Sequence, residues 1–175
     1  PLNDPQTLSL FTSTKALGYA PEQMRGVEFG VLGVPEFGTK PTMRILKQTM
    51  PTTMSELVRI SGLSHGTDVW KGNAEDLILS GVTTLSGAIC TRDDIMLSLV
   101  DKGVEHQRAF FIMESVRKGM WAKGRDKNQS EHEAAMKAAH VPEWFIESCR
   151  KIQYMFPKAH AAAYVVNAFR IAYYK

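Results

Sequence analysis

Hydrophobic residues recur along this chain at the spacing of helices rather than of strands. Ile112, Met113 and Val116 lie three, four and seven residues after Ala109, which places all four on one face of a helix. The same period recurs in the last stretch of the chain, and no stretch alternates convincingly between apolar and polar residues. We therefore expect a mainly α fold, a set of helices joined by long loops with little or no sheet.

Capping signals mark where the predicted helices begin and end. Asp4 before Pro5 predicts a short helix to about Thr12, because Asp caps a helix and Pro suits its first position. The capping box from Thr53 to Glu56 predicts a helix that runs to Ile60 and is stopped by Gly62. Further helix starts are predicted at Pro21, Lys40, Asn73, Thr91, Ser130, Pro142 and Pro157.

Three stretches are predicted to be loops. Residues 26–40 are rich in glycine and are the expected hinge or exposed connection, and residues 61–72 form a polar loop. Residues 119–130 are charged and have no helical period, so we expect an exposed charged loop there.

Composition places the chain among ordinary globular proteins. With 175 residues, 44% of them apolar and 22% charged, it can bury one core and fits one domain, or one domain with a subdomain. It has no signal peptide and no 18-residue apolar run, so we expect no membrane partner. Cys90 and Cys149 are not at metal-like spacing, which favours reduced thiols and a cytoplasmic location. The chain opens without Met, and we expect it to be a fragment of a larger one.

Cationic and donor side chains at helix starts are the first candidates for binding an anion. Lys158 and His160 lie in the first turn after Pro157, where free N–H groups and the helix dipole attract negative charge. Arg92 likewise lies in the first turn of its predicted helix, where a cation opposes the dipole. The competing interpretations are a packing helix with a solvated Lys158, and an Arg92 that pairs with Asp93 or Asp94.

A second group of candidates lies in and near predicted loops. Ser64 and His65 precede Gly66 in a stretch typical of a backbone-donor loop, although such a stretch is more often an ordinary turn. Arg59 lies one turn before this loop, and Arg117 and Lys118 end a predicted helix, where cations also simply satisfy the dipole.

Other chemistry-bearing residues are assigned structural roles. The adjacent pair Asp93–Asp94 is explained by helix capping, so we expect no metal site in this chain. The histidines His106, His132 and His140 are expected on helix surfaces, without metal spacing. Trp121 and Trp144 could stack on a base, but packing in a core or interface is commoner for Trp.

Five stretches, taken in order, resemble C-family bacterial replicative DNA polymerases of the PolC type, the DNA polymerase III alpha subunit of Gram-positive bacteria. They are GVPEFGT at 33–39, ISGLSHGTDVW at 60–70, TRDDIM at 91–96, IMESVRKG at 112–119 and YMFPKAHAAAY at 154–164. The likeness covers nearly the whole chain, and it implies the fingers domain over residues 1–175. The stretch from Met120 to Gln129 departs from the family pattern by being longer and more charged.

The resemblance implies a DNA-directed DNA polymerase as the parent protein. Its partners would be template–primer DNA, dNTPs, a palm domain and replisome subunits, and the full-length enzyme would use Mg²⁺. The palm carboxylates would lie upstream, so we expect no cofactor in this chain and no activity from it alone. The resemblance favours a dNTP-binding role for Arg92, His65, Lys118, Lys158 and His160, with Ser64, Arg59 and Arg117 as further candidates.

Two alternatives use the same residues differently. A free-standing helical nucleic-acid-binding module would show salt-dependent DNA affinity without a triphosphate site. A helical scaffold that binds only protein would show neither.

Overall fold

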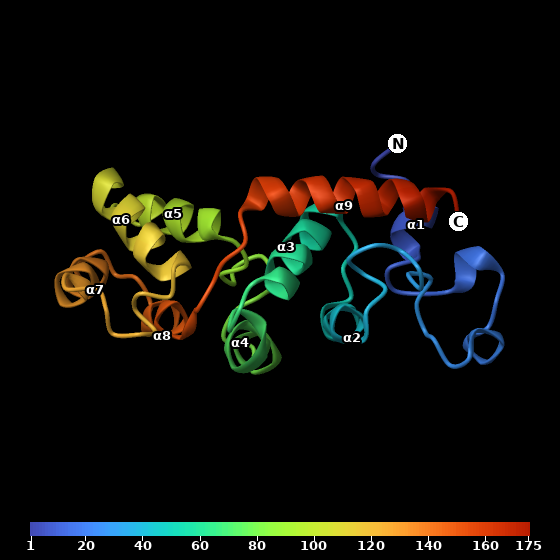
Figure 1. The fold of residues 1–175 in the computed structure, drawn as a ribbon, viewed down its shortest axis with the longest axis horizontal. Coiled ribbons are helices and arrows are strands. Elements are labelled where there is room, and N and C mark those ends of the chain that lie inside the picture. The colour runs from blue at the N-terminus through green and yellow to red at the C-terminus, as the bar shows by residue number, and fades with distance from the viewer. The chain divides into compact units, whose positions relative to one another are not determined.

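The structure is a computed structural model that describes all 175 residues, and its regular elements are helices (Figure 1). It has nine α-helices and no strand, since its one strand-like feature is an isolated antiparallel bridge between Thr67 and Tyr154. The predicted mainly α fold is therefore confirmed. The elements are α1 (Pro5–Ser9), η1 (Lys15–Leu17), η2 (Pro21–Met24), α2 (Lys40–Thr49), α3 (Met54–His65), η3 (Trp70–Ala74), α4 (Glu75–Leu79), α5 (Arg92–Asp101), α6 (His106–Arg117), α7 (Gln129–Ala138), α8 (Glu143–Lys151) and α9 (Lys158–Tyr173).

The chain forms two compact units. The first unit contains Pro1–Ser64 and Ala159–Lys175, and the second contains His65–Lys158. Each unit has its own buried apolar side chains, so each is described by itself.

Aromatic side chains form the core of the first unit. The ring of Phe11 meets the ring of Phe37 edge-on at 5.0 Å between centroids, and it stacks on Phe169 of α9 at 6.4 Å. All three side chains are fully buried. Residues 26–40 are irregular as predicted, but Phe29, Val31, Val34 and Phe37 from this stretch are buried, so the stretch is anchored to the core. Its role as a hinge stays a prediction.

Two antiparallel helices, α5 and α6, lie side by side in the second unit (Figure 1). The face predicted for α6 is confirmed, because Ala109, Ile112, Met113 and Val116 are all buried. On α5 the buried residues are Ile95 and Leu99, whereas Val100 is 40% exposed. Gly103 follows the α5 C-cap with φ +90°, the left-handed conformation expected of a glycine helix stop.

An arginine joins α7 to α8. The guanidinium of Arg150 donates to both carboxylate oxygens of Glu133, at 2.8 and 2.7 Å, and to Glu147 at 2.6 Å. These bonds raise the pKa of Arg150 and, together with Gln129, lower the pKa of Glu133. Arg150 is therefore a structural cation.

Several local predictions are corrected by the structure. α3 does not stop at Gly62 but continues to His65, because Leu57, Ile60 and Leu63 are buried along it and packing outweighs the roughly 1 kcal/mol helix penalty of glycine. The helix predicted at Ser130 begins at Gln129, after the N-cap position Asn128. α1 ends at Ser9, before the predicted Thr12.

Two side chains expected near the surface are buried. His132 is 7% exposed, because it shares the buried face of α7 with Met136, one helical turn away. Trp121 is 3% exposed in a stretch predicted to be exposed, and its indole N–H donates to Asp126 at 2.9 Å. Trp121 is thus a packing residue and offers no ring for stacking on a base. His106 and His140 are exposed, as predicted.

None of the helices combines the length and the apolar character that a bilayer crossing requires.

Candidate functional site

Residues Ile152–Lys158, which we call the connecting segment, link α8 to the start of α9 and contact several elements of the second unit. Thr67 donates its N–H to Tyr154 O at 2.9 Å, and its own carbonyl accepts the N–H groups of Gln153 and Tyr154 at 3.1 and 3.3 Å. The Met155 N–H donates to Arg117 O at 3.3 Å. Backbone bonds therefore fix this segment to the stretch after α3 and to the end of α6.

Two glycines let the connecting segment approach closely. A Cβ on Gly66 would lie 3.0 Å from Tyr154 O and 2.5 Å from Val69 Cγ2. A Cβ on Gly119 would lie 2.5 Å from Gln153 O, and Gly119 also has φ +70°. Gly66 and the Thr67 N–H are thus engaged by the connecting segment, and a donor role for Ser64 and His65 stays a prediction.

The start of α5 holds the end of the connecting segment. Asp93 Oδ2 accepts the Lys158 N–H at 2.8 Å, across 65 residues of sequence. The neighbouring Asp94 instead accepts the N–H groups of Cys90 and Thr91, both at 2.9 Å, which confirms the predicted capping box. Each carboxylate is thus engaged by backbone N–H groups.

This arrangement brings the backbones of two predicted cations, Arg92 and Lys158, close together. Lys158 donates its N–H to Asp93, and Arg92 is the residue before Asp93. Arg92 is half-buried and Lys158 is exposed, and neither side chain forms a salt bridge. The interpretation in which Arg92 pairs with an aspartate is therefore not supported. Two cations without a carboxylate partner lie near one point of the second unit.

Arg117 and Lys118, in contrast, are both paired with a carboxylate. The Arg117 guanidinium binds both oxygens of Glu114, at 2.6 and 2.8 Å, and Lys118 Nζ lies 3.2 Å from the same carboxylate. The hydrogen bond from Arg117 is the main cause that holds the pKa of Glu114 at about 2, well below its usual value. Glu114 therefore already neutralises part of the positive charge at the end of α6.

The remaining candidates are divided between the two units. His65 ends α3, and its ring lies 4.8 Å from the ring of Phe156 in the connecting segment. Ser64 donates its hydroxyl back to Ser61 O at 3.0 Å, a bond within α3. Arg59, Ser64 and His160 belong to the first unit, and His160 is exposed. Their roles in binding stay predictions.

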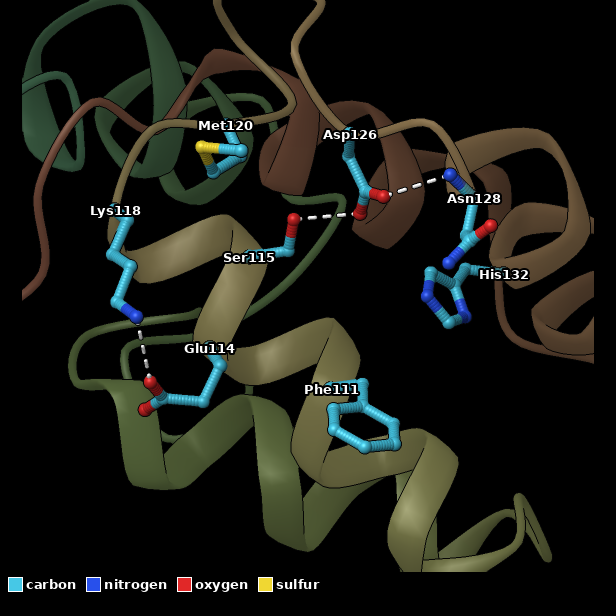
Figure 2. A pocket seen from close by; sticks show the side chains of 8 residues that line it. All are labelled: Phe111, Glu114, Ser115, Lys118, Met120, Asp126, Asn128 and His132. Atoms are coloured by element: carbon cyan, nitrogen blue, oxygen red, sulfur yellow. Dashed lines mark hydrogen bonds and ion pairs between the residues drawn. The ribbon is translucent and has the colours of Figure 1, made fainter.

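A cavity of about 450 Å³ lies beside the end of α6, and Figure 2 shows the side chains that line it. Asp126 holds one wall: its carboxylate accepts the Ser115 hydroxyl at 2.6 Å and the Asn128 N–H at 2.9 Å. Burial opposes ionisation of Asp126, but these bonds and the one from Trp121 lower its pKa overall. Burial lowers the pKa of His132, which lines the same cavity. Sequence reasoning missed Asp126 because no motif links it to Ser115.

No group of three or more His, Cys, Asp or Glu residues in the chain is arranged to hold a metal ion. Asp93 and Asp94 do not fit a magnesium pair, because each carboxylate is already engaged by backbone N–H groups. Burial raises the pKa of the Cys149 thiol, so the reactive thiolate is disfavoured. What this chain can contribute to a site is cations and backbone geometry.

Comparison with known proteins gives a consistent result. Residues 1–140 match the family model described as the bacterial DNA polymerase III alpha subunit finger domain. Proteins named DNA polymerase III PolC-type are similar over the whole chain: the one from Lactococcus lactis at 54% identity, from Caldanaerobacter subterraneus at 58% and from Streptococcus pneumoniae at 54%. The chain spans only 11–12% of the length of these relatives.

Proposed function

Because the chain belongs to the finger-domain family of the bacterial DNA polymerase III alpha subunit, we propose that it positions the incoming deoxynucleotide against the templating base in a PolC-type replicative polymerase. Nucleotidyl transfer itself would take place in a palm domain outside this chain, where carboxylates would hold Mg²⁺. Template–primer DNA, dNTPs and other replisome subunits are the proposed partners, and the cytoplasm is the proposed location.

The observation that carries this proposal is the hydrogen bond from the Lys158 N–H to Asp93, the residue that follows Arg92. A triphosphate has several anionic oxygens, so a site for it needs cations that are not already neutralised and that lie close together. Neither the Arg92 nor the Lys158 side chain forms a salt bridge, and the hydrogen bond from the Lys158 N–H to Asp93 brings the two backbones together, which supports the proposal. Among the other predicted cations of the second unit, Arg117 and Lys118 share Glu114.

The proposed role is electrostatic and positional. As a phosphoryl group is transferred, negative charge develops on the leaving pyrophosphate, and fixed cations stabilise that charge. Arg92 can donate two parallel hydrogen bonds to a phosphate, whereas Lys158 acts as a point charge on a flexible stem. Both would orient the α-phosphate for attack by the primer terminus.

Steady-state kinetics of the full-length polymerase test this function. Arg92→Ala, Lys158→Ala and His160→Ala should each lower kcat/KM for dNTP by about 10- to 150-fold. This is the loss in rate expected when one charge-assisted hydrogen bond to phosphate is removed. The affinity for primed DNA should barely change. Normal dNTP kinetics together with a lower melting temperature would make these residues structural, and a loss of DNA affinity alone would make them template contacts.

A further inference from the structure

We propose that Asp93 is a positioning residue for the incoming nucleotide: its carboxylate holds the Lys158 backbone so that Lys158 and Arg92 serve the same triphosphate. This inference rests on the proposed function. It assigns a role to an aspartate that is neither a metal ligand nor a cap of its own helix.

The contact itself is specific. Asp93 Oδ2 lies 2.8 Å from the backbone nitrogen of Lys158, a normal distance for a charge-assisted hydrogen bond. Asp94, one residue on, accepts the backbone N–H groups of Cys90 and Thr91 and the Thr91 hydroxyl, all at the start of its own helix. Adjacent carboxylates thus have different tasks: Asp94 fixes the start of α5, and Asp93 fixes a residue 65 positions away.

Asp93 holds the end of the connecting segment, which the other polar contacts of the segment do not reach. The contacts at Thr67 and Arg117 are between backbone groups and hold residues 153–155. The hydrogen bond at Lys158 is made by a side chain and lies at the end of the segment, where the candidate phosphate-binding residue is. Without it, Lys158 would be separated by two residues, Phe156 and Pro157, from the nearest of these backbone bonds.

In the proposed role, the Asp93 oxygen is needed to accept the Lys158 N–H, whereas its negative charge does not favour nucleotide binding. A carboxylate beside a triphosphate repels it, so a residue selected for charge would be unfavourable at this position. A neutral asparagine oxygen can accept the same N–H and removes the repulsion. Glutamate keeps the charge but moves the oxygen by one methylene. The three side chains therefore separate geometry from charge.

The experiment compares Asp93→Ala, Asp93→Asn and Asp93→Glu in the full-length polymerase, with Asp101→Ala as the matched control. Asp101 lies at the exposed last residue of the same helix. Asp93→Ala should lower kcat/KM for dNTP by about fivefold to tenfold, as expected for one lost hydrogen bond, while the Kd for primed DNA stays unchanged. Asp93→Asn should stay within about twofold of the parent, and Asp93→Glu should resemble Asp93→Ala.

Coupling between residues gives a second readout. Arg92→Ala should cost less in an Asp93→Ala background than alone, because both changes disrupt one anion site. Additive losses, or Asp93→Ala kinetics equal to the parent while Arg92→Ala is impaired, would overturn the positioning role and leave the proposed function intact. An Asp93→Ala enzyme that uses dNTP better would mean that Asp93 competes with the nucleotide.

Two further outcomes decide the remaining cases. If Arg92→Ala and Lys158→Ala both leave dNTP kinetics unchanged, the proposed function fails and the role of Asp93 falls with it. If Asp93→Ala melts too low to assay, the Asn and Glu variants decide the question: equal activities for the two would overturn the positioning role.

Discussion

The buried side chains of Asn73 and Ser148 hydrogen-bond to each other across 75 residues of sequence. The Ser148 hydroxyl donates to Asn73 Oδ1, and Asn73 Nδ2 donates to Ser148 O at 3.1 Å and to Asp68 O at 2.9 Å. Asn73 is 2% exposed and Ser148 is 3% exposed, so water cannot replace either partner. This pair joins η3 to α8 inside the second unit.

Removing the Asn73 side chain should therefore be costly. Asn73→Ala leaves the Ser148 carbonyl and hydroxyl without these partners in a buried place, and we expect a loss of about 2–3 kcal/mol in the free energy of unfolding. Denaturant unfolding of the parent and the variant measures the difference. Asn128→Ala is the control: Asn128 is exposed, and its side chain makes no capping bond, so the change should stay within about 0.5 kcal/mol. Equal losses in the two variants would contradict this account.

Gly119 should tolerate substitution less well than Gly124, although both have left-handed backbone conformations, with φ +70° and +62°. An added Cβ at Gly119 would lie 2.5 Å from the backbone oxygen of Gln153, whereas one at Gly124 would meet nothing within 4 Å. Both alanine variants carry the conformational cost of about 1 kcal/mol, and only Gly119→Ala also pushes the connecting segment away. We expect Gly119→Ala to be less stable than Gly124→Ala by at least about 1 kcal/mol. Identical unfolding midpoints would show that the segment moves freely.

Stability should fall in acid because of Glu114. Its pKa is held at about 2 in the folded chain, below the unfolded value of 4.5, so its ion pairs stabilise the fold fully above pH 4.5 and are lost as the pH falls toward 2. The contribution is at most about 3 kcal/mol, and solvent screening reduces it because the side chain is 22% exposed. Glu114→Gln should flatten the unfolding free energy between pH 4.5 and 2, and Glu22→Gln, at an exposed residue, is the comparison variant. Parallel pH profiles for the parent and Glu114→Gln would rule out this linkage.

Local signals predicted much of the fold. The Asp4 cap, the Thr91–Asp94 capping box and the buried face of α6 depend on residues within a few positions of each other, and all three are confirmed. The α3 prediction failed at Gly62 because burial of its neighbours, which a local signal does not report, decided the outcome.

The candidate site was predicted only in part, because its contacts are long-range. Sequence reasoning selected Arg92 and Lys158 separately, from helix starts and from the family resemblance. It could not find the hydrogen bond from Lys158 to Asp93, since an aspartate in a capping box already has a sufficient local explanation. It also could not tell Arg117 from Arg92, because pairing with Glu114 depends on side-chain geometry at the end of α6.

That difference leads to a ranking of the four cations in the full-length polymerase. Arg117 is held in two hydrogen bonds by Glu114, and Lys118 is beside the same carboxylate, so a phosphate reaching either must share it with Glu114. The side chains of Arg92 and Lys158 form no salt bridge with a carboxylate; Asp93 accepts only the Lys158 backbone N–H. We expect Arg117→Ala and Lys118→Ala to lower kcat/KM for dNTP by less than about fivefold, well below the loss from Arg92→Ala or Lys158→Ala.

Melting temperature supplies the independent check on this ranking. Arg117→Ala should destabilise the fold, because it breaks the ion pair that lowers the pKa of Glu114, whereas Arg92→Ala should leave the melting temperature nearly unchanged. Activity and stability should thus separate: Arg92 affects nucleotide use, and Arg117 affects folding. If Arg117→Ala lost as much nucleotide efficiency as Arg92→Ala while melting like the parent, the Glu114 pair would not be structural. The triphosphate site would then have to include the end of α6.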